Sequence, residues 1–196
     1  MFQVRFHGRG GQGVVTAAEL LSVAAFAEGR HAQAFPSFGS ERTGAPVVSF
    51  CRIAEVAVRT REPVAAPDAL VVQDVTLLYQ VDLFRGLAAD GYLLLNSARP
   101  ASELGIGEIL ARLPSGRVAT VPATELAMAH VGRPLPNAPL LGAFAALTGA
   151  VSLGAVQRAL TGRFAGAVGT SNAAAAAEAY RLVRPAQEAL VRAPSA

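Results

Sequence analysis

The first thirty residues carry a hydrophobic pattern that changes its period once. Apolar and polar side chains alternate over 3–7, which predicts a short strand. A glycine-dense turn follows at 8–13, and over 13–28 the apolar side chains recur at the spacing of one buried helix face. Gly29 comes directly after this pattern, where a helix C-terminal glycine is expected. The segment is therefore predicted to be a strand–turn–helix unit that opens an α/β fold.

Short apolar runs alternate with helical patterns along the rest of the chain. Further strands are predicted at 31–35, 47–53, 55–59, 69–73, 91–96 and 118–121, with 47–53 and 55–59 forming an antiparallel hairpin. Helices are predicted through 77–83, from Pro122 to about 131, and over 138–147, 153–160 and 172–190, the last interrupted by Pro185. The predicted fold class is α/β: a mostly parallel sheet with helices on both faces, an antiparallel hairpin portion and a helical C-terminal region. We expect one domain over 1–192 and a frayed tail at 193–196.

Composition and charge narrow the class of protein. The chain has 196 residues, of which 52% are apolar and 16% charged, and this suits a compact domain and excludes a disordered chain. The net charge of +3 is carried by dispersed arginines, because the sequence has no lysine, and no aromatic platform accompanies them. We therefore expect no nucleic-acid partner. The start of the chain lacks the features of a signal peptide, which makes the cytoplasm the expected location.

The residues that bind metals in proteins are scarce in this sequence. Cys51 is the single cysteine, which excludes an intrachain disulfide and any iron–sulfur cluster held by this chain alone, since a cluster needs about four thiolates. Cys51 lies in an apolar run and is expected to be a small buried hydrophobe. The histidines (His7, His31 and His130) are scattered, so no metal site is predicted. Residues 138–157 carry no charge, but their glycines and polar side chains favour two buried helices over a membrane span.

The sharpest local feature is the turn between the first strand and the first helix. It supplies the candidate cofactor-binding residues, which are Gly8, Arg9, Gly10, Gly11, Gln12 and Gly13. The Gly-x-Gly-x-x-Gly spacing allows positive φ, and the free N–H groups at a helix start can hold an anion. However, no acidic residue ends the next strand, as an NAD site requires, and Val14 and Val15 stand where a P-loop has Lys and Ser or Thr. A phosphate cradle and a purely structural turn therefore both remain open.

Other polar residues have two interpretations each. His7 is next to the turn and could orient a ligand, or it could be satisfied within the fold. Asp74 and Asn96 end predicted strands, where open α/β sheets bind ligands, but capping of the following helix explains them equally well. The segment 35–46 combines aromatic and charged residues between prolines, which suits a docking surface. The candidate interface residues are Phe35, Pro36, Ser37, Phe38, Glu41 and Arg42. No catalytic residue is predicted.

The motifs taken together resemble a known family. The stretches 7–13, 16–21, 32–42 and 44–46 closely resemble the gamma subunit of pyruvate:ferredoxin oxidoreductases, within the wider group of 2-oxoacid:acceptor oxidoreductases. The stretches 67–74 and 91–97, and Asn137 with the pair Leu141-Gly142, continue the resemblance, which covers roughly 3–164. The joint occurrence of Gly-Gly-Gln-Gly and Pro-Ser-Phe-Gly-x-Glu-Arg is far more specific than either motif alone.

The resemblance implies a Rossmann-like subunit of a larger enzyme. Such complexes decarboxylate a 2-oxoacid on thiamine diphosphate, pass two electrons through iron–sulfur clusters to ferredoxin or another acceptor, and hand the acyl group to coenzyme A. The resemblance places thiamine diphosphate and Mg²⁺ in the alpha and beta subunits, and the clusters in beta and a ferredoxin-like delta subunit. This chain is thus expected to be a separate subunit that holds no cofactor alone, completes the assembly and walls off the path to thiamine diphosphate.

Three questions stay open at this point. A coenzyme A phosphate site at the turn is a further expectation, and a subunit that contacts no ligand is its alternative. Pyruvate is the expected 2-oxoacid, but Arg42-Thr-Gly-Ala45 replaces the Arg-Gly-Gly that the family often shows and leaves the substrate unsettled. The rival interpretation is an autonomous nucleotide-binding module or small dehydrogenase, which would bind NAD or a flavin by itself.

Overall fold

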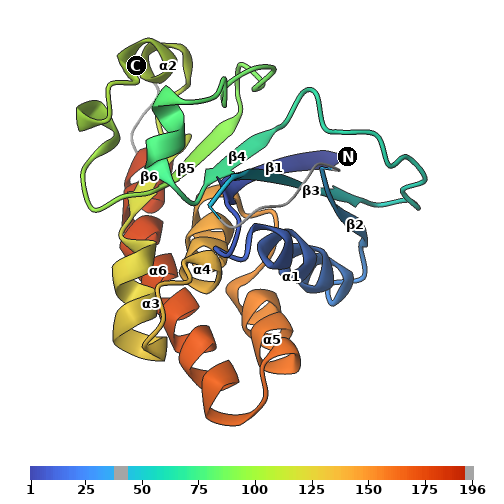
Figure 1. Ribbon diagram of the computed structural model, residues 1–196. Coiled ribbons are helices and arrows are strands. Elements are labelled where there is room, and N and C mark those ends of the chain that lie inside the picture. The colour runs from blue at the N-terminus through green and yellow to red at the C-terminus, as the bar shows by residue number, and fades with distance from the viewer. Residues whose placement is uncertain (38–43, 193–196) are drawn as a thin grey trace.

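A six-stranded mixed sheet forms the centre of the molecule (Figure 1). The computed structural model describes residues 1–37 and 44–192, with side chains through Arg184. The strands are β1 (Phe2–Arg9), β2 (His31–Pro36), β3 (Pro46–Ala54), β4 (Ala69–Val72), β5 (Tyr92–Asn96) and β6 (Val118–Val121), in the order β2-β3-β1-β4-β5-β6. The strands β1, β4, β5 and β6 run parallel, whereas β3 is antiparallel to both β1 and β2. The predicted α/β class with a mostly parallel sheet is confirmed.

The predicted antiparallel portion is present, but it pairs β3 with β2 and β1 and not with the predicted segment 55–59. The expectation that 47–53 pairs with 55–59 is wrong, because β3 already pairs with β1 along one edge and with β2 along the other. Residues 55–59 therefore have no free edge to join. Arg52 instead reaches from β3 to the carbonyl oxygens of Thr60 (3.4 Å) and Glu62 (2.6 Å), which follow this segment in the chain.

Helices cover the two faces of the sheet unequally. On one face lie α1 (Val14–Phe26), α3 (Ala123–Val131), α4 (Asn137–Thr148), α5 (Leu153–Arg163) and α6 (Gly166–Arg192). On the other face, the short elements η1 (Val75–Tyr79), η2 (Ala101–Glu103) and α2 (Gly107–Arg112) cover β4, β5 and β6. The helix α4 is buried all along 137–147 and lies among the sheet, α1, α5 and α6, so it forms the centre of the larger core.

The boundaries of α3, α4 and α5 follow the predicted pattern. The helix predicted through 77–83 is wrong, because the chain forms only the short 3₁₀ helix η1 there, and α2 was not predicted. The helix α6 begins at Gly166, before the predicted start at 172. The helices α4 and α5 are joined near Gly149 (φ 64°), as expected. The predicted interruption at Pro185 is wrong, since helical backbone continues to Arg192. One missing backbone hydrogen bond does not end a helix that packs against α3, α4 and α5. Within the part of the chain that the structure describes, no helix is long and apolar enough to cross a membrane. The expected tail at 193–196 lies outside the described residues.

Candidate functional site

The glycine turn lies where the chain changes direction across the sheet. After β1 the chain passes through α1 to β2 and β3 on one side of β1, and later returns to place β4 on the other side. The carboxyl ends of β1 and β4 thus flank a topological switch point, where open α/β sheets bind their ligands. This position makes the turn at 8–13 the first candidate for a functional site.

Two glycines of the turn are required by close packing. A Cβ at Gly8 would lie 2.6 Å from Val14 Cγ2 and 3.2 Å from Gln73 Cβ. A Cβ at Gly13, where φ is 74°, would lie 2.8 Å from Nδ2 of Asn137 at the start of α4. Both sites therefore exclude larger side chains for structural reasons alone.

The same turn also leaves donors free. Gly13 precedes α1 and provides no side-chain cap, and the first turn of α1 contains no acidic residue. Among the described residues no acceptor binds the N–H groups of Val14, Val15 and Thr16. These residues and the turn line a surface depression of about 310 Å³. Free N–H groups at the positive end of a helix suit an anion such as a phosphate.

The side chains of Arg9 and Gln12 are engaged inside the fold. Oδ2 of Asp74 accepts hydrogen bonds from Arg9 Nε (3.0 Å) and Gln12 Nε2 (2.9 Å), and Gln12 Oε1 accepts from the Arg9 N–H (2.7 Å). The remaining guanidinium nitrogens of Arg9 donate to Thr76 Oγ1, Gln80 Oε1 and the Gly44 carbonyl. These contacts brace the turn, so the groups it offers to a ligand belong mainly to the backbone.

The bracing carboxylate is ionised. Burial raises the pKa of Asp74, but hydrogen bonds from Thr76 and Gln12 and the positive charge of Arg9 outweigh it, and the pKa ends below its usual value. The capping interpretation of Asp74 agrees with the structure, because its Oδ1 also accepts from Thr76 N (3.0 Å) at the start of η1. Thr76 and Gln80 were not predicted from the sequence, where nothing distinguishes them from other loop residues.

Asn96 caps a helix rather than facing the depression. Its side chain donates to the Gln73 carbonyl (2.8 Å) and to Thr124 Oγ1 (2.8 Å), and accepts from the Thr124 N–H at the start of α3. Gln73 itself is 1% exposed, and its amide nitrogen and oxygen have no partner among the described residues. The sequence signal for Gln73 was only that a polar residue ends an apolar strand.

His7 does not reach the turn. Neighbouring strand residues point to opposite faces, so His7 lies on the other side of the sheet from Gly8. It is 7% exposed, and burial, together with the charge of Arg5, lowers its pKa to about 3. The imidazole is therefore neutral at physiological pH, and the geometry favours a structural role.

The predicted interface segment is described only in part. The Phe35 ring lies 5.2 Å from the Phe50 ring and beneath the Arg52 guanidinium (5.1 Å), so it is half-buried by its own fold. Pro36 ends β2, and the exposed Ser37 donates its N–H to the Val48 carbonyl. The other predicted interface residues, Phe38, Glu41 and Arg42, lie outside the described residues.

Metal-binding groups do not gather in the described part of the chain. Within 1–37 and 44–184 no three His, Cys, Asp or Glu side chains are placed to hold a metal ion. Cys51 is fully buried, which confirms the sequence expectation, and burial raises the pKa of its thiol.

Comparison with known proteins decides the family. Residues 3–182 match the family described as pyruvate ferredoxin/flavodoxin oxidoreductase. The chain belongs to this family. It is 44% identical over 184 residues to the pyruvate synthase subunit PorC of Methanothermobacter marburgensis, an alignment that covers 94% of this chain and 98% of the relative. It is 46% identical over 180 residues to the pyruvate/ketoisovalerate oxidoreductases common subunit gamma of Pyrococcus abyssi, covering 92% and 96% respectively.

Solved structures agree with this membership. The pyruvate oxidoreductase subunit PORC of Thermotoga maritima superposes with a TM-score of 0.76 at 35% identity, over 92% of this chain and 95% of that one. The 2-oxoglutarate:ferredoxin oxidoreductase of Magnetococcus marinus, solved with 2-oxoglutarate, coenzyme A and succinyl-CoA bound, gives a TM-score of 0.69. At 16% identity, over 98% of this chain and 32% of that one, the second likeness shows the fold alone. The resemblance inferred from the sequence motifs is confirmed.

Proposed function

We propose that this chain is the gamma subunit of a thiamine-diphosphate-dependent 2-oxoacid:ferredoxin oxidoreductase, with pyruvate as its 2-oxoacid. The observation that carries the proposal is near-complete alignment, at 44–46% identity, with relatives that are themselves PorC or gamma subunits. The single cysteine of the sequence supports it, because the iron–sulfur clusters must then belong to other chains. Its partners are alpha, beta and ferredoxin-like delta subunits, and we place the complex in the cytoplasm.

The chain's own contribution to the reaction is structural and electrostatic. Thiamine diphosphate and Mg²⁺ in the partner subunits supply the decarboxylation chemistry. This chain completes the assembly and presents the N–H groups of Val14, Val15 and Thr16 to a phosphate of coenzyme A. The Asp74 network supports this role, because it keeps the turn in one conformation without placing a carboxylate in the depression.

Co-expression of the tagged chain with the other subunits tests the subunit role. We expect a stable complex that reduces ferredoxin or a dye in the presence of pyruvate and coenzyme A. The isolated chain should show no such activity and should bind neither NAD nor a flavin. A solitary chain that carried a redox cofactor and turned over substrate would support the rival dehydrogenase interpretation.

A charge at the helix start tests the phosphate cradle. Val15→Asp places a carboxylate beside the free N–H groups. There it interacts favourably with the positive end of the α1 dipole, and it repels a phosphate. The variant complex should assemble normally and show a KM for coenzyme A raised about tenfold or more, corresponding to at least 1.4 kcal/mol, with the KM for pyruvate unchanged. Val15→Asn is the uncharged control. An unaltered KM for coenzyme A in the intact Val15→Asp complex would leave the turn with a structural role only.

A further inference from the structure

A groove of about 530 Å³ runs between α1 and α5, away from the glycine turn and its depression. Its floor is apolar and buried, formed by Leu20 and Ala159. Glu19 and Val23 form the α1 wall, and Arg158 and Arg163 form the α5 wall. A groove between two helices, with an apolar floor and charged walls, has the shape that accepts an amphipathic helix.

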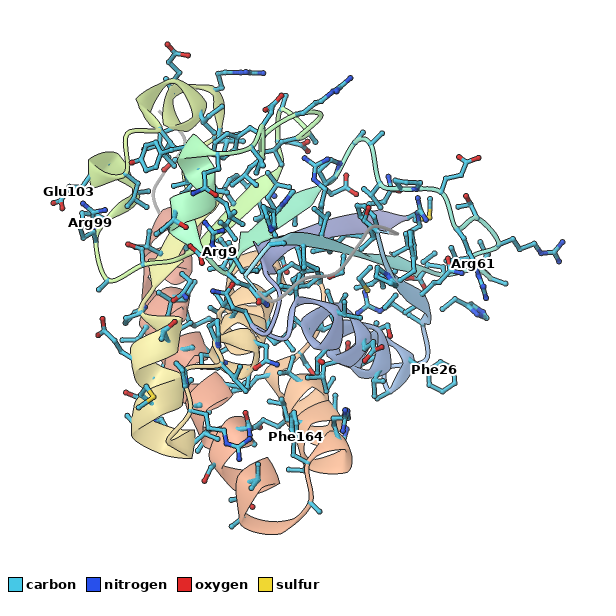
Figure 2. All side chains as sticks on the ribbon, viewed as in Figure 1. Arg9, Phe26, Arg61, Arg99, Glu103 and Phe164 are labelled. Carbon is cyan, nitrogen blue, oxygen red and sulfur yellow. The ribbon has the colours of Figure 1, made fainter. Side chains whose placement is uncertain are left out.

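The α1 side of the groove carries unusual apolar exposure. Val23 is 52% exposed and Phe26, one turn further on the same face, is 72% exposed. The Phe26 ring projects away from the molecule in Figure 2. Exposed aromatic side chains beside a groove are typical anchors of protein interfaces. On the opposite wall, Gly162 leaves the groove open, because a Cβ there would meet no atom within 4 Å.

The charges indicate what fits the groove. Arg158 and Glu19 make no side-chain hydrogen bond or ion pair within the described residues, and Arg163 only lies over the Phe164 ring (5.5 Å). Two arginines against one glutamate leave the walls positive. A second copy of this chain is a poor complement, since a two-fold contact would bring four arginines to two glutamates. A segment with carboxylates beside its apolar face complements the groove.

We propose that the α1–α5 groove is a docking surface for an amphipathic, carboxylate-bearing helix of another subunit of the same complex. The inference rests on the proposed subunit role and adds a second contact surface to the one predicted around residues 35–42. The apolar face of the helix packs on Leu20, Val23 and Phe26. Its carboxylates pair with Arg158 and Arg163.

Filling the groove tests the proposal in the assembled complex. Gly162→Leu inserts a side chain into open space and improves helix propensity, so the chain itself should fold at least as well as wild type. We expect its affinity for the partner subunits to fall about tenfold or more in a co-elution titration. The double variant Arg158→Glu/Arg163→Glu should weaken assembly similarly. The matched controls are Gly107→Leu, another open helical glycine, and Arg61→Glu/Arg99→Glu, at exposed arginines elsewhere (Figure 2).

A photo-crosslinker at Val23 identifies the occupant. We expect a crosslinked peptide from another subunit that contains Asp or Glu in a helical pattern. A crosslink to a second copy of this chain, or none, would overturn the proposal, as would normal assembly of both groove variants. If wild type itself does not join the other subunits, the proposed function fails together with this inference. If wild type assembles and the groove variants do too, only the inference fails.

Discussion

His7 shows how the sheet controls the charge of one residue. Its side chain lies on β1 between those of Arg5 and Arg9, nearly covered by neighbouring segments, and its Nε2 has no partner among the described residues. Burial is the larger cause that lowers its pKa to about 3, and the positive charge of Arg5 lowers the pKa further. Protonation would leave a buried cation without a counter-ion, which is costly.

The depressed pKa of His7 predicts a pH dependence of stability. Below pH 6.5, the ordinary pKa of histidine, His7 is protonated in the unfolded chain. In the folded chain it stays neutral down to about pH 3. Above pH 6.5 His7 is neutral in both states and costs no stability. As the pH falls from 6.5 toward 3, His7 lowers the free energy of unfolding by about 1.4 kcal/mol per pH unit. We expect wild type to lose about 2 kcal/mol more than His7→Gln between pH 7 and pH 5, measured by urea unfolding. His31→Gln, at an exposed position, is the control; equal losses in wild type and His7→Gln would contradict the expectation.

The residues of the site were predicted more fully than their partners. The turn at 8–13 and the strand-end position of Asp74 are visible in the sequence, because glycine spacing and strand ends are local signals. The bonds of Arg9 and Gln12 to Asp74 are not visible, since they join residues 65 and 62 positions apart through the parallel pairing of β1 and β4. The sheet order must therefore be known before the backbone donors that could bind a ligand can be distinguished from the side chains that brace the turn.

At the scale of elements, close contact between α4 and α6 depends on one glycine. A Cβ at Gly142 would lie 1.9 Å from the carbonyl oxygen of Ala176, a backbone atom that cannot move without shifting α6. The helix α4 lies at the centre of the larger core, so a shift at this contact would disturb packing on several sides.

Gly142→Ala should lower the free energy of unfolding by about 3 kcal/mol or more, because the core has no room for the added methyl group. Gly162→Ala makes the same chemical change on α5, where a Cβ meets open space. That control should raise the free energy of unfolding by up to about 1 kcal/mol through helix propensity. Chemical unfolding of both variants measures the difference, and similar effects of the two changes would show that the α4–α6 contact is loose.

The elements themselves were predicted where the pattern is local. The period change around the glycine turn located β1 and α1, and Gly149 marked the junction of α4 and α5. The hairpin was misassigned because 47–53 and 55–59 look equally strand-like, and only the pairing of β3 with both β1 and β2 excludes the second segment. The continuity of α6 through residue 185 depends on packing along its length, which no local signal reveals.

At the scale of the whole molecule, the two faces of the sheet are stabilised to different extents. One cluster joins the sheet to five long helices and contains most of the buried apolar residues that the structure describes. The other cluster is small and lies under η1, η2 and the single short helix α2. The segments 75–90 and 97–113, which flank β5, therefore rest on few buried contacts and are expected to open without global unfolding.

Amide hydrogen exchange tests this division of the molecule. Amides in 75–90 and 97–113 should exchange through local openings, whereas those of α4 and β1 should exchange only on global unfolding. Leu83→Ala and Leu140→Ala each remove a fully buried leucine, at a cost of about 2–5 kcal/mol, but from different clusters. Leu83→Ala should accelerate exchange mainly within 75–90 and 97–113, because the loss falls on the segments that already open by themselves. Leu140→Ala should accelerate exchange in α4 and β1 as well, since its cluster sets the global free energy of unfolding. If both variants accelerate exchange equally everywhere, the two faces form one cooperative unit.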